Sequence, residues 1–149
     1  MSSYHVWVAL SAIPLQQKGN KVARITGIGG IFFKGRDPDT LSAWYREHLE
    51  IDIDDDHVFT FRWREYDEPE REASTVWSIF PLDTTYFGPG TVPFMINYRV
   101  ADLDAVLVEL GDEGVEIDEK REDNEYGRFA WIVDPEGNRI ELWQPAPGL

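Results

Sequence analysis

Apolar and polar residues alternate along several short stretches of the chain, which is the pattern of strands with one buried face. In HVFTFRW, residues 57–63, Phe59, Phe61 and Trp63 fall on one side and Val58 and Thr60 on the other. Similar β-rich stretches predict six further strands, at residues 25–35, 74–82, 93–100, 115–121, 127–134 and 138–144.

Two other stretches follow a helical spacing. Residues 37–49 begin with Asp37 as a candidate N-cap and Pro38 at the first helical position. Residues 102–114 begin with Asp102 in the same role and stop at Gly114. The spacing predicts an apolar stripe on each helix: Leu41, Trp44, Tyr45, His48 and Leu49 on the first, and Leu103, Val106, Leu107 and Leu110 on the second.

With seven of the eight strands that it needs marked by these stretches, we predict that the order strand–helix–strand–strand–strand occurs twice, at an offset of 65 residues that aligns Asp37 with Asp102. The Gly- and Pro-rich segment YFGPGTVP, residues 86–93, separates the copies as a hinge. We therefore predict an α+β domain over residues 23–146, with a first module at about 24–85 and a second at about 92–146. Residues 1–22 are interpreted as an N-terminal extension, which includes the strand-like YHVWVAL.

Composition limits the partners. The 149 residues are 42% hydrophobic, enough for one domain with a core, and no stretch approaches the roughly 18 apolar residues of a membrane span. A net charge of −14 disfavours nucleic acid and anionic membranes. The acidic surface is compatible with simple solubility and with adaptation to high salt.

No cysteine and no secretory signal pattern are present, and we expect a cytoplasmic protein.

The second half of the chain resembles the vicinal oxygen chelate superfamily of glyoxalases, bleomycin-resistance proteins and extradiol dioxygenases. The resemblance lies in RVADLDAVLVELGDEGVEI, residues 99–117, and YGRFAWIVDPEGNRIELWQP, residues 126–145, and more weakly in residues 25–51. It implies paired βαβββ modules whose curved mixed sheets form a half-open barrel with the helices outside. In metal-using members, the first and last strands of each module supply the ligands of one divalent ion.

Only one of the four implied ligand positions carries a suitable residue. Glu141 occupies the carboxylate position of the last strand, and alternation places it opposite Ile140 and Leu142, facing the barrel. The other three positions fall on Gly30, Met95 and, within a residue, Ser78, none of which is a hard ligand. We therefore expect no metal and no other cofactor.

The same alternation predicts a pocket around Glu141. Its walls would combine aromatic and thioether groups with one amide and opposed charges, a mixture that suits an organic ligand with a few polar groups. Gly30 would leave room, and Arg99 would bind a carboxylate or phosphate. The predicted ligand-binding residues are Phe32, Lys34, Met95, Asn97, Arg99, Trp131 and Trp143.

Each assignment has a structural alternative. Glu141 and Arg99 would form a buried ion pair, Phe32 and Met95 would fill the core, and Lys34 and Arg139 would reach solvent at the rim. The directions of Trp77, Tyr86 and Trp131 stay open.

The function that these residues favour is metal-independent binding of a small organic molecule, by a protein that we expect to form a homodimer. The alternative is a lyase, isomerase or dioxygenase-type enzyme of the superfamily, with Glu141 as its general base or as a metal ligand. A third possibility is a structural or stress-response partner without a ligand. The sequence alone leaves open whether the protein is an enzyme.

Overall fold

A computed structural model describes residues 24–149. The predicted extension, residues 1–22 with its strand-like YHVWVAL, lies outside the described residues. The elements follow in the order β1 (Ile25–Gly35), α1 (Pro38–Leu49), β2 (Val58–Arg64), β3 (Glu72–Pro81), β4 (Phe94–Val100), α2 (Leu103–Asp112), β5 (Glu116–Asn124), β6 (Gly127–Val133) and β7 (Arg139–Pro145).

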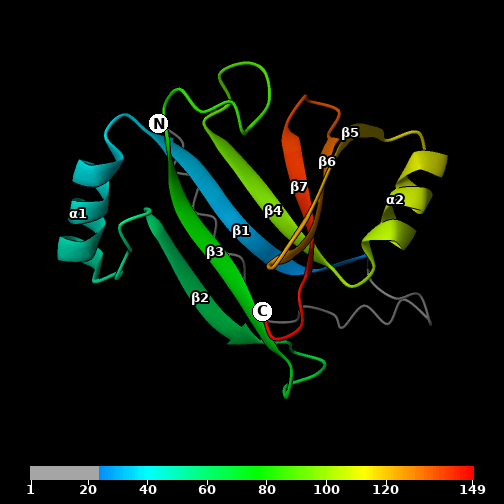
Figure 1. The fold of residues 1–149 in the computed structure, drawn as a ribbon, viewed down its shortest axis with the longest axis horizontal. Helices are drawn as coiled ribbons and strands as arrows, with labels where there is room; N and C mark the ends of the chain where they lie inside the picture. Colours follow the sequence, from blue (N-terminus) through cyan, green and yellow to red (C-terminus); the bar gives the residue numbers. More distant parts are fainter. Residues whose placement is uncertain (1–23) are drawn as a thin grey trace, which may run out of the picture.

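All seven strands join one mixed sheet in the order β2-β3-β1-β4-β7-β6-β5. Within each half, the first and last strands are parallel neighbours, β1 with β3 and β4 with β7. The halves meet where β1 runs antiparallel to β4. The sheet curves between α1 and α2, which lie at opposite ends (Figure 1). The predicted α+β class with a curved mixed sheet is confirmed.

The two halves differ in one strand. The second half has the predicted strand–helix–strand–strand–strand order, whereas residues 50–57 of the first half form an irregular segment with a turn at 55–56 in place of a strand. The carboxylate of Asp54 accepts hydrogen bonds from the backbone of Asp56 and Val58 at 3.0 and 2.8 Å. Such local hydrogen bonds compete with strand pairing, because they occupy backbone N–H groups that would otherwise bond to a neighbouring strand.

Both helices begin as predicted. Asp37 and Asp102 have nearly the same extended backbone, with φ of −137° and −139°, and each side chain accepts from the amide three residues on, Thr40 at 3.1 Å and Ala105 at 3.0 Å. Neither helix in residues 24–149 is long and apolar enough to cross a membrane.

The core beneath α2 fixes the direction of β7. Leu103 and Val106 are buried against the sheet together with Leu142, and Ile140 packs against the same cluster. This confirms the apolar stripe predicted for α2. Because neighbouring residues of a strand point to opposite faces, Glu141 projects away from α2.

The stripe predicted for α1 is partly wrong. Tyr45 packs edge-on against Trp77 and Phe33, at ring-centroid distances of 4.9 and 6.2 Å. Trp44 and Leu49, predicted on the same face, are 49% and 53% exposed. A 12-residue helix at the end of a sheet covers little of it, and so only part of the stripe is buried.

The second helix cap offers a test of local stability. We expect Asp102→Ala to lower the free energy of unfolding by about 0.5–2 kcal/mol, because the amide of Ala105 loses its acceptor at the helix N-terminus. Urea denaturation measures this loss. The matched control is Asp112→Ala at the other end of α2, which we expect to leave stability unchanged or slightly raised. Equal losses in both variants would contradict a capping role.

Candidate functional site

Glu141 lies at the centre of the inner face of the sheet, with only 2% of its surface exposed. Its register partners on the neighbouring strands are Asn97 of β4 and Trp131 of β6. The Asn97 amide donates to Oε1 at 2.7 Å, and the Trp131 indole donates to Oε2 at 3.0 Å. The Tyr86 hydroxyl donates to Oε2 from the segment between β3 and β4. Three neutral donors from three parts of the chain thus hold one buried carboxylate.

Burial dominates the electrostatics of this carboxylate. Desolvation raises the pKa of Glu141 above its ordinary value, and the hydrogen bonds from Tyr86, Asn97 and Trp131 offset part of that rise. Burial and then the nearby Glu141 charge raise the pKa of Tyr86, which keeps the phenol protonated as a donor. The site therefore combines a carboxylate of increased basicity with a fixed phenol.

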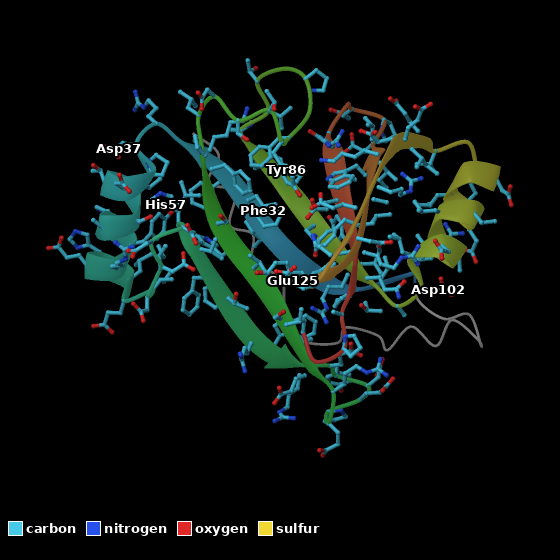
Figure 2. The ribbon with its side chains drawn as sticks, in the orientation of Figure 1. Phe32, Asp37, His57, Tyr86, Asp102 and Glu125 are labelled. Atoms are coloured by element: carbon cyan, nitrogen blue, oxygen red, sulfur yellow. The ribbon has the colours of Figure 1, made fainter. Side chains whose placement is uncertain are left out.

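Aromatic side chains enclose the group. Tyr86 stacks on Phe80 at 5.5 Å and meets the edge of Trp131 at 6.2 Å between centroids. Phe32, Phe87, Met95 and Trp131 form one buried cluster on this side of the sheet. Phe32 and Tyr86 lie in the middle of the molecule, between the helices whose N-caps Asp37 and Asp102 mark (Figure 2). Rings of the 82–93 segment thus cover Glu141.

Two cations contact the Trp131 ring of this cluster. The Lys120 Nζ lies 4.6 Å from the Trp131 ring centroid, and the Arg139 guanidinium carbon lies 5.3 Å from the same centroid. Arg139 also pairs with Asp118 at 2.5 Å. Both cations contact the ring of Trp131, and no ion pair joins either of them to Glu141 within residues 24–149.

The space expected at Gly30 is filled. A Cβ placed on Gly30 would lie 2.6 Å from Cζ of Phe32, so the Phe32 ring stands where a ligand side chain of β1 would project. The prediction that Gly30 leaves room for a ligand is therefore wrong in this conformation. The phenyl ring of Phe32, two residues along the strand, leans back over the glycine, and the Cβ of Asn97 closes the same space at 3.1 Å from the added atom.

The side chains around Glu141 do not fit a divalent metal. Its neighbours donate a phenol, an amide and an indole, and an indole N–H has no lone pair to offer a cation. In the described part of the chain, no group of three or more His, Cys, Asp or Glu side chains is placed to hold a metal ion. These side chains donate hydrogen bonds, and such donors stabilise an anion.

The predicted pocket residues separate into two groups. Phe32, Met95, Asn97 and Trp131 gather around Glu141. Arg99 and Trp143 form a second group, in which the guanidinium lies 5.0 Å from the Trp143 ring centroid. Lys34 borders the first group, because its Nζ lies 5.6 Å from the ring centroid of Phe87 in the same cluster.

The predicted alternative of a Glu141–Arg99 ion pair is wrong. The Arg99 guanidinium donates to the backbone oxygens of Ser74 and Leu149 at 3.2 and 2.8 Å, and the Glu141 carboxylate accepts from the three neutral donors. Register explains the separation, because Arg99 lies opposite Trp143 and Asn97 lies opposite Glu141.

Sequence reasoning gave too little weight to Tyr86 and missed Phe87. Both lie in the Gly- and Pro-rich segment, where neither strand nor helix periodicity predicts a direction. The available signal was two adjacent aromatic residues in an otherwise turn-forming stretch. Trp77, whose direction the sequence left open, packs against Phe33 and Tyr45 on the α1 side instead.

Comparison with solved structures identifies the fold. Methylmalonyl-CoA epimerase from Mycobacterium tuberculosis aligns with a TM-score of 0.54 and 20% identity, over 88% of this chain and 95% of that one. A variant of the Streptomyces coelicolor methylmalonyl-CoA epimerase, in complex with 2-nitronate-propionyl-CoA, aligns with a TM-score of 0.59 and 17% identity, over 82% and 99%. A Legionella pneumophila structure described as an NAD-dependent benzaldehyde dehydrogenase aligns with a TM-score of 0.50 and 12% identity, over 78% and 98%.

A scan against protein-family models and a search of the curated proteins gave no match. At 20% identity and below, the structural likenesses show the fold alone, an α+β fold with a curved mixed sheet that this chain shares with the methylmalonyl-CoA epimerase structures. The fold expected from the sequence resemblance is therefore confirmed.

The raised pKa of Glu141 predicts a pH dependence of stability. A carboxyl whose folded-state pKa exceeds its unfolded value contributes fully below the unfolded value, about 4.5, and loses that contribution as pH rises through the folded pKa. We therefore expect the stability of the wild-type protein relative to Glu141→Gln to fall as pH rises above 4.5. Urea denaturation of both proteins between pH 4 and 8 measures the difference. A wild-type free energy of unfolding that rises relative to that of Glu141→Gln as the pH increases would contradict a raised pKa of Glu141.

Proposed function

We propose that this protein binds a small organic molecule beside Glu141 without using a divalent metal. The observation that carries the proposal is the environment of the carboxylate, buried and hydrogen-bonded by Tyr86, Asn97 and Trp131. A buried acid needs donors, and a ligand with hydroxyl or amide N–H groups supplies the same kind of partner. Aromatic walls around a few polar groups are typical of sites for organic ligands.

Ligand entry requires the 82–93 segment to move. Its backbone hydrogen bonds are largely local, since Thr84 bonds back to Pro81 and Gly88 to Thr85. The Tyr86 hydroxyl bond to Glu141 and the Lys34 amide bond to Pro93 link the segment to the sheet. Gly88 and Gly90 have φ of 87° and 98°, a region that most other residues avoid. Outward movement of Tyr86 would free one acceptor position on Glu141 for the ligand.

An isomerase is the second candidate. Burial raises the pKa of Glu141, which strengthens it as a base, and proton abstraction next to a carbonyl requires such a base. The fold is shared with structures of methylmalonyl-CoA epimerases. In this candidate reaction, Glu141 removes a proton from the carbon next to the carbonyl, and the Tyr86 hydroxyl donates a hydrogen bond to the enolate oxygen that forms. The protonated Glu141 then returns the proton to another atom of the enolate, which gives the isomer and restores the carboxylate.

The remaining expectations extend this proposal. We propose one domain over residues 23–146 built from modules at about 24–85 and 92–146, a homodimer in solution, and a cytoplasmic location. The net charge of −14 supports a small-molecule partner over nucleic acid.

Binding is tested by thermal shift with a panel of aromatic acids, hydroxyketones and acyl-CoA esters that includes methylmalonyl-CoA. We expect at least one compound class to raise the melting temperature equally with and without EDTA. Glu141→Gln should weaken that binding roughly ten- to hundredfold, because a charge-assisted hydrogen bond is worth about 1.5–3 kcal/mol. The control is Glu116→Gln at the exposed start of β5, which should bind normally. Binding that depends on an added divalent ion would overturn the proposal.

The isomerase candidate is tested by proton exchange. Each compound that binds is incubated with the protein in D₂O, and NMR follows deuterium incorporation next to its carbonyl group. We expect exchange with the wild-type protein and a loss of at least about a hundredfold in Glu141→Gln, which cannot act as a base. Binding without exchange would leave the binding function standing and reject the isomerase.

A further inference from the structure

Glu141 has no positively charged partner. Within residues 24–149, no ion pair joins it to a lysine, an arginine or a histidine, and its hydrogen-bond donors are a phenol, an amide and an indole. Glu122 is the charged group that shifts the pKa of Glu141, and because it is also an acid it raises that pKa further. The buried carboxylate therefore lacks the opposite charge that would stabilise it most.

The two cations that contact the indole ring of the site already have acids of their own. Arg139 pairs with Asp118 at 2.5 Å, and the Lys120 Nζ lies 4.0 Å from a carboxylate oxygen of Glu122. Each of these two positive charges is thus matched by a neighbouring negative charge, and that of Glu141 is not.

The aromatic rings around Glu141 are also favourable places for positive charge. The Lys120 Nζ lies 4.6 Å from the ring centroid of Trp131 and 5.7 Å from that of Tyr86. The Lys34 Nζ lies 5.6 Å from the ring centroid of Phe87. The face of an aromatic ring is negative and attracts cations, whereas it repels anions. The rings and the carboxylate therefore favour the same sign of charge in a ligand.

The Tyr86 side chain shows what size and shape of group reaches the carboxylate. Its ring is partly exposed, stacks on Phe80 at 5.5 Å and meets the edge of Trp131 at 6.2 Å between centroids. Its hydroxyl donates to Oε2 of Glu141. Outward movement of Tyr86 would open a space of the same shape, from the surface to this oxygen. A ligand that fills the space has a flat apolar body and a hydrogen-bond donor at its end.

We propose that the ligand of the Glu141 site is an organic ammonium ion, a protonated amine attached to a flat apolar body. The inference rests on the binding function proposed above and names its ligand class. The ammonium N–H donates to Glu141 in place of the Tyr86 hydroxyl, and the apolar body takes the place of the Tyr86 ring beside Phe80 and Trp131. The net charge of −14 raises the concentration of cations near the molecule and lowers that of anions.

The experiment compares three compounds that share a phenyl ring and one methylene group: benzylammonium, benzyl alcohol and phenylacetate, at pH 7 and equal ionic strength. The Trp131 indole donates to the same carboxylate at 3.0 Å, so the NMR resonance of its N–H reports binding at this site. We expect benzylammonium to bind about tenfold more tightly than benzyl alcohol, because a charge-assisted hydrogen bond is roughly twice as strong as a neutral one. Phenylacetate should bind most weakly.

Three variants of the full chain separate the site from the overall charge. Glu141→Gln should abolish the preference for benzylammonium over benzyl alcohol. Glu116→Gln, at the exposed start of β5, changes the net charge equally and should keep the preference. Lys120→Met removes a cation that competes for the Trp131 ring, and should leave benzylammonium binding unchanged or tighter.

The outcomes distinguish the ligand class from the binding function itself. Equal affinities for benzyl alcohol and benzylammonium would reject the ammonium class and leave the binding function standing. Tightest binding of phenylacetate, weakened by Lys120→Met, would overturn the proposal in favour of organic acids. If none of the three compounds and none of the panel above shifts the Trp131 resonance, the Glu141 site itself is rejected. If Glu141→Gln fails to fold, the order of affinities in the wild-type protein decides alone.

Discussion

The burial of one carboxylate without a counter-charge is the constraint around which the centre of this protein is built. Glu141 is 2% exposed, and its donors come from β4, β6 and the segment that links the two halves of the chain. Each donor is neutral, and a buried acid that loses a donor suffers a desolvation cost of about 1–3 kcal/mol or more. The carboxylate therefore ties the linking segment to the second half through Tyr86.

Register separates Glu141 from a buried cation on the neighbouring strand. Arg99 lies two residues along β4 from Asn97 and opposite Trp143, whereas Asn97 lies opposite Glu141. Simple electrostatics would pair Arg99 with Glu141, yet Arg99 donates to main-chain oxygens of Ser74 and Leu149. The carboxylate of Glu141 is left among neutral donors and aromatic rings, which stabilise an ion less than an opposite charge does. A carboxylate buried in this way is costly for a fold alone, and that cost favours a role in binding.

The site also shows how the metal positions implied by the sequence resemblance are filled in this chain. The Phe32 ring covers Gly30, and the donors around the remaining acid are an amide, a phenol and an indole. The Glu141 carboxylate can therefore act as a hydrogen-bond acceptor or as a base. Ligand binding and proton transfer are the functions that agree with these two roles. The shared fold with methylmalonyl-CoA epimerase structures fits either function and chooses neither.

The sequence by itself determined what depends on local rules. Period-two alternation placed Glu141 opposite Leu142, and short-range capping placed Asp37 and Asp102 at their helix starts. Tertiary structure decided what depends on packing between distant segments: the irregular segment at 50–57, the covering of Gly30, and the choice of Tyr86 instead of Arg99 as the partner of Glu141. Periodicity gives the face on which a side chain lies, but loops have no period, and the register between strands is set only when the whole sheet assembles.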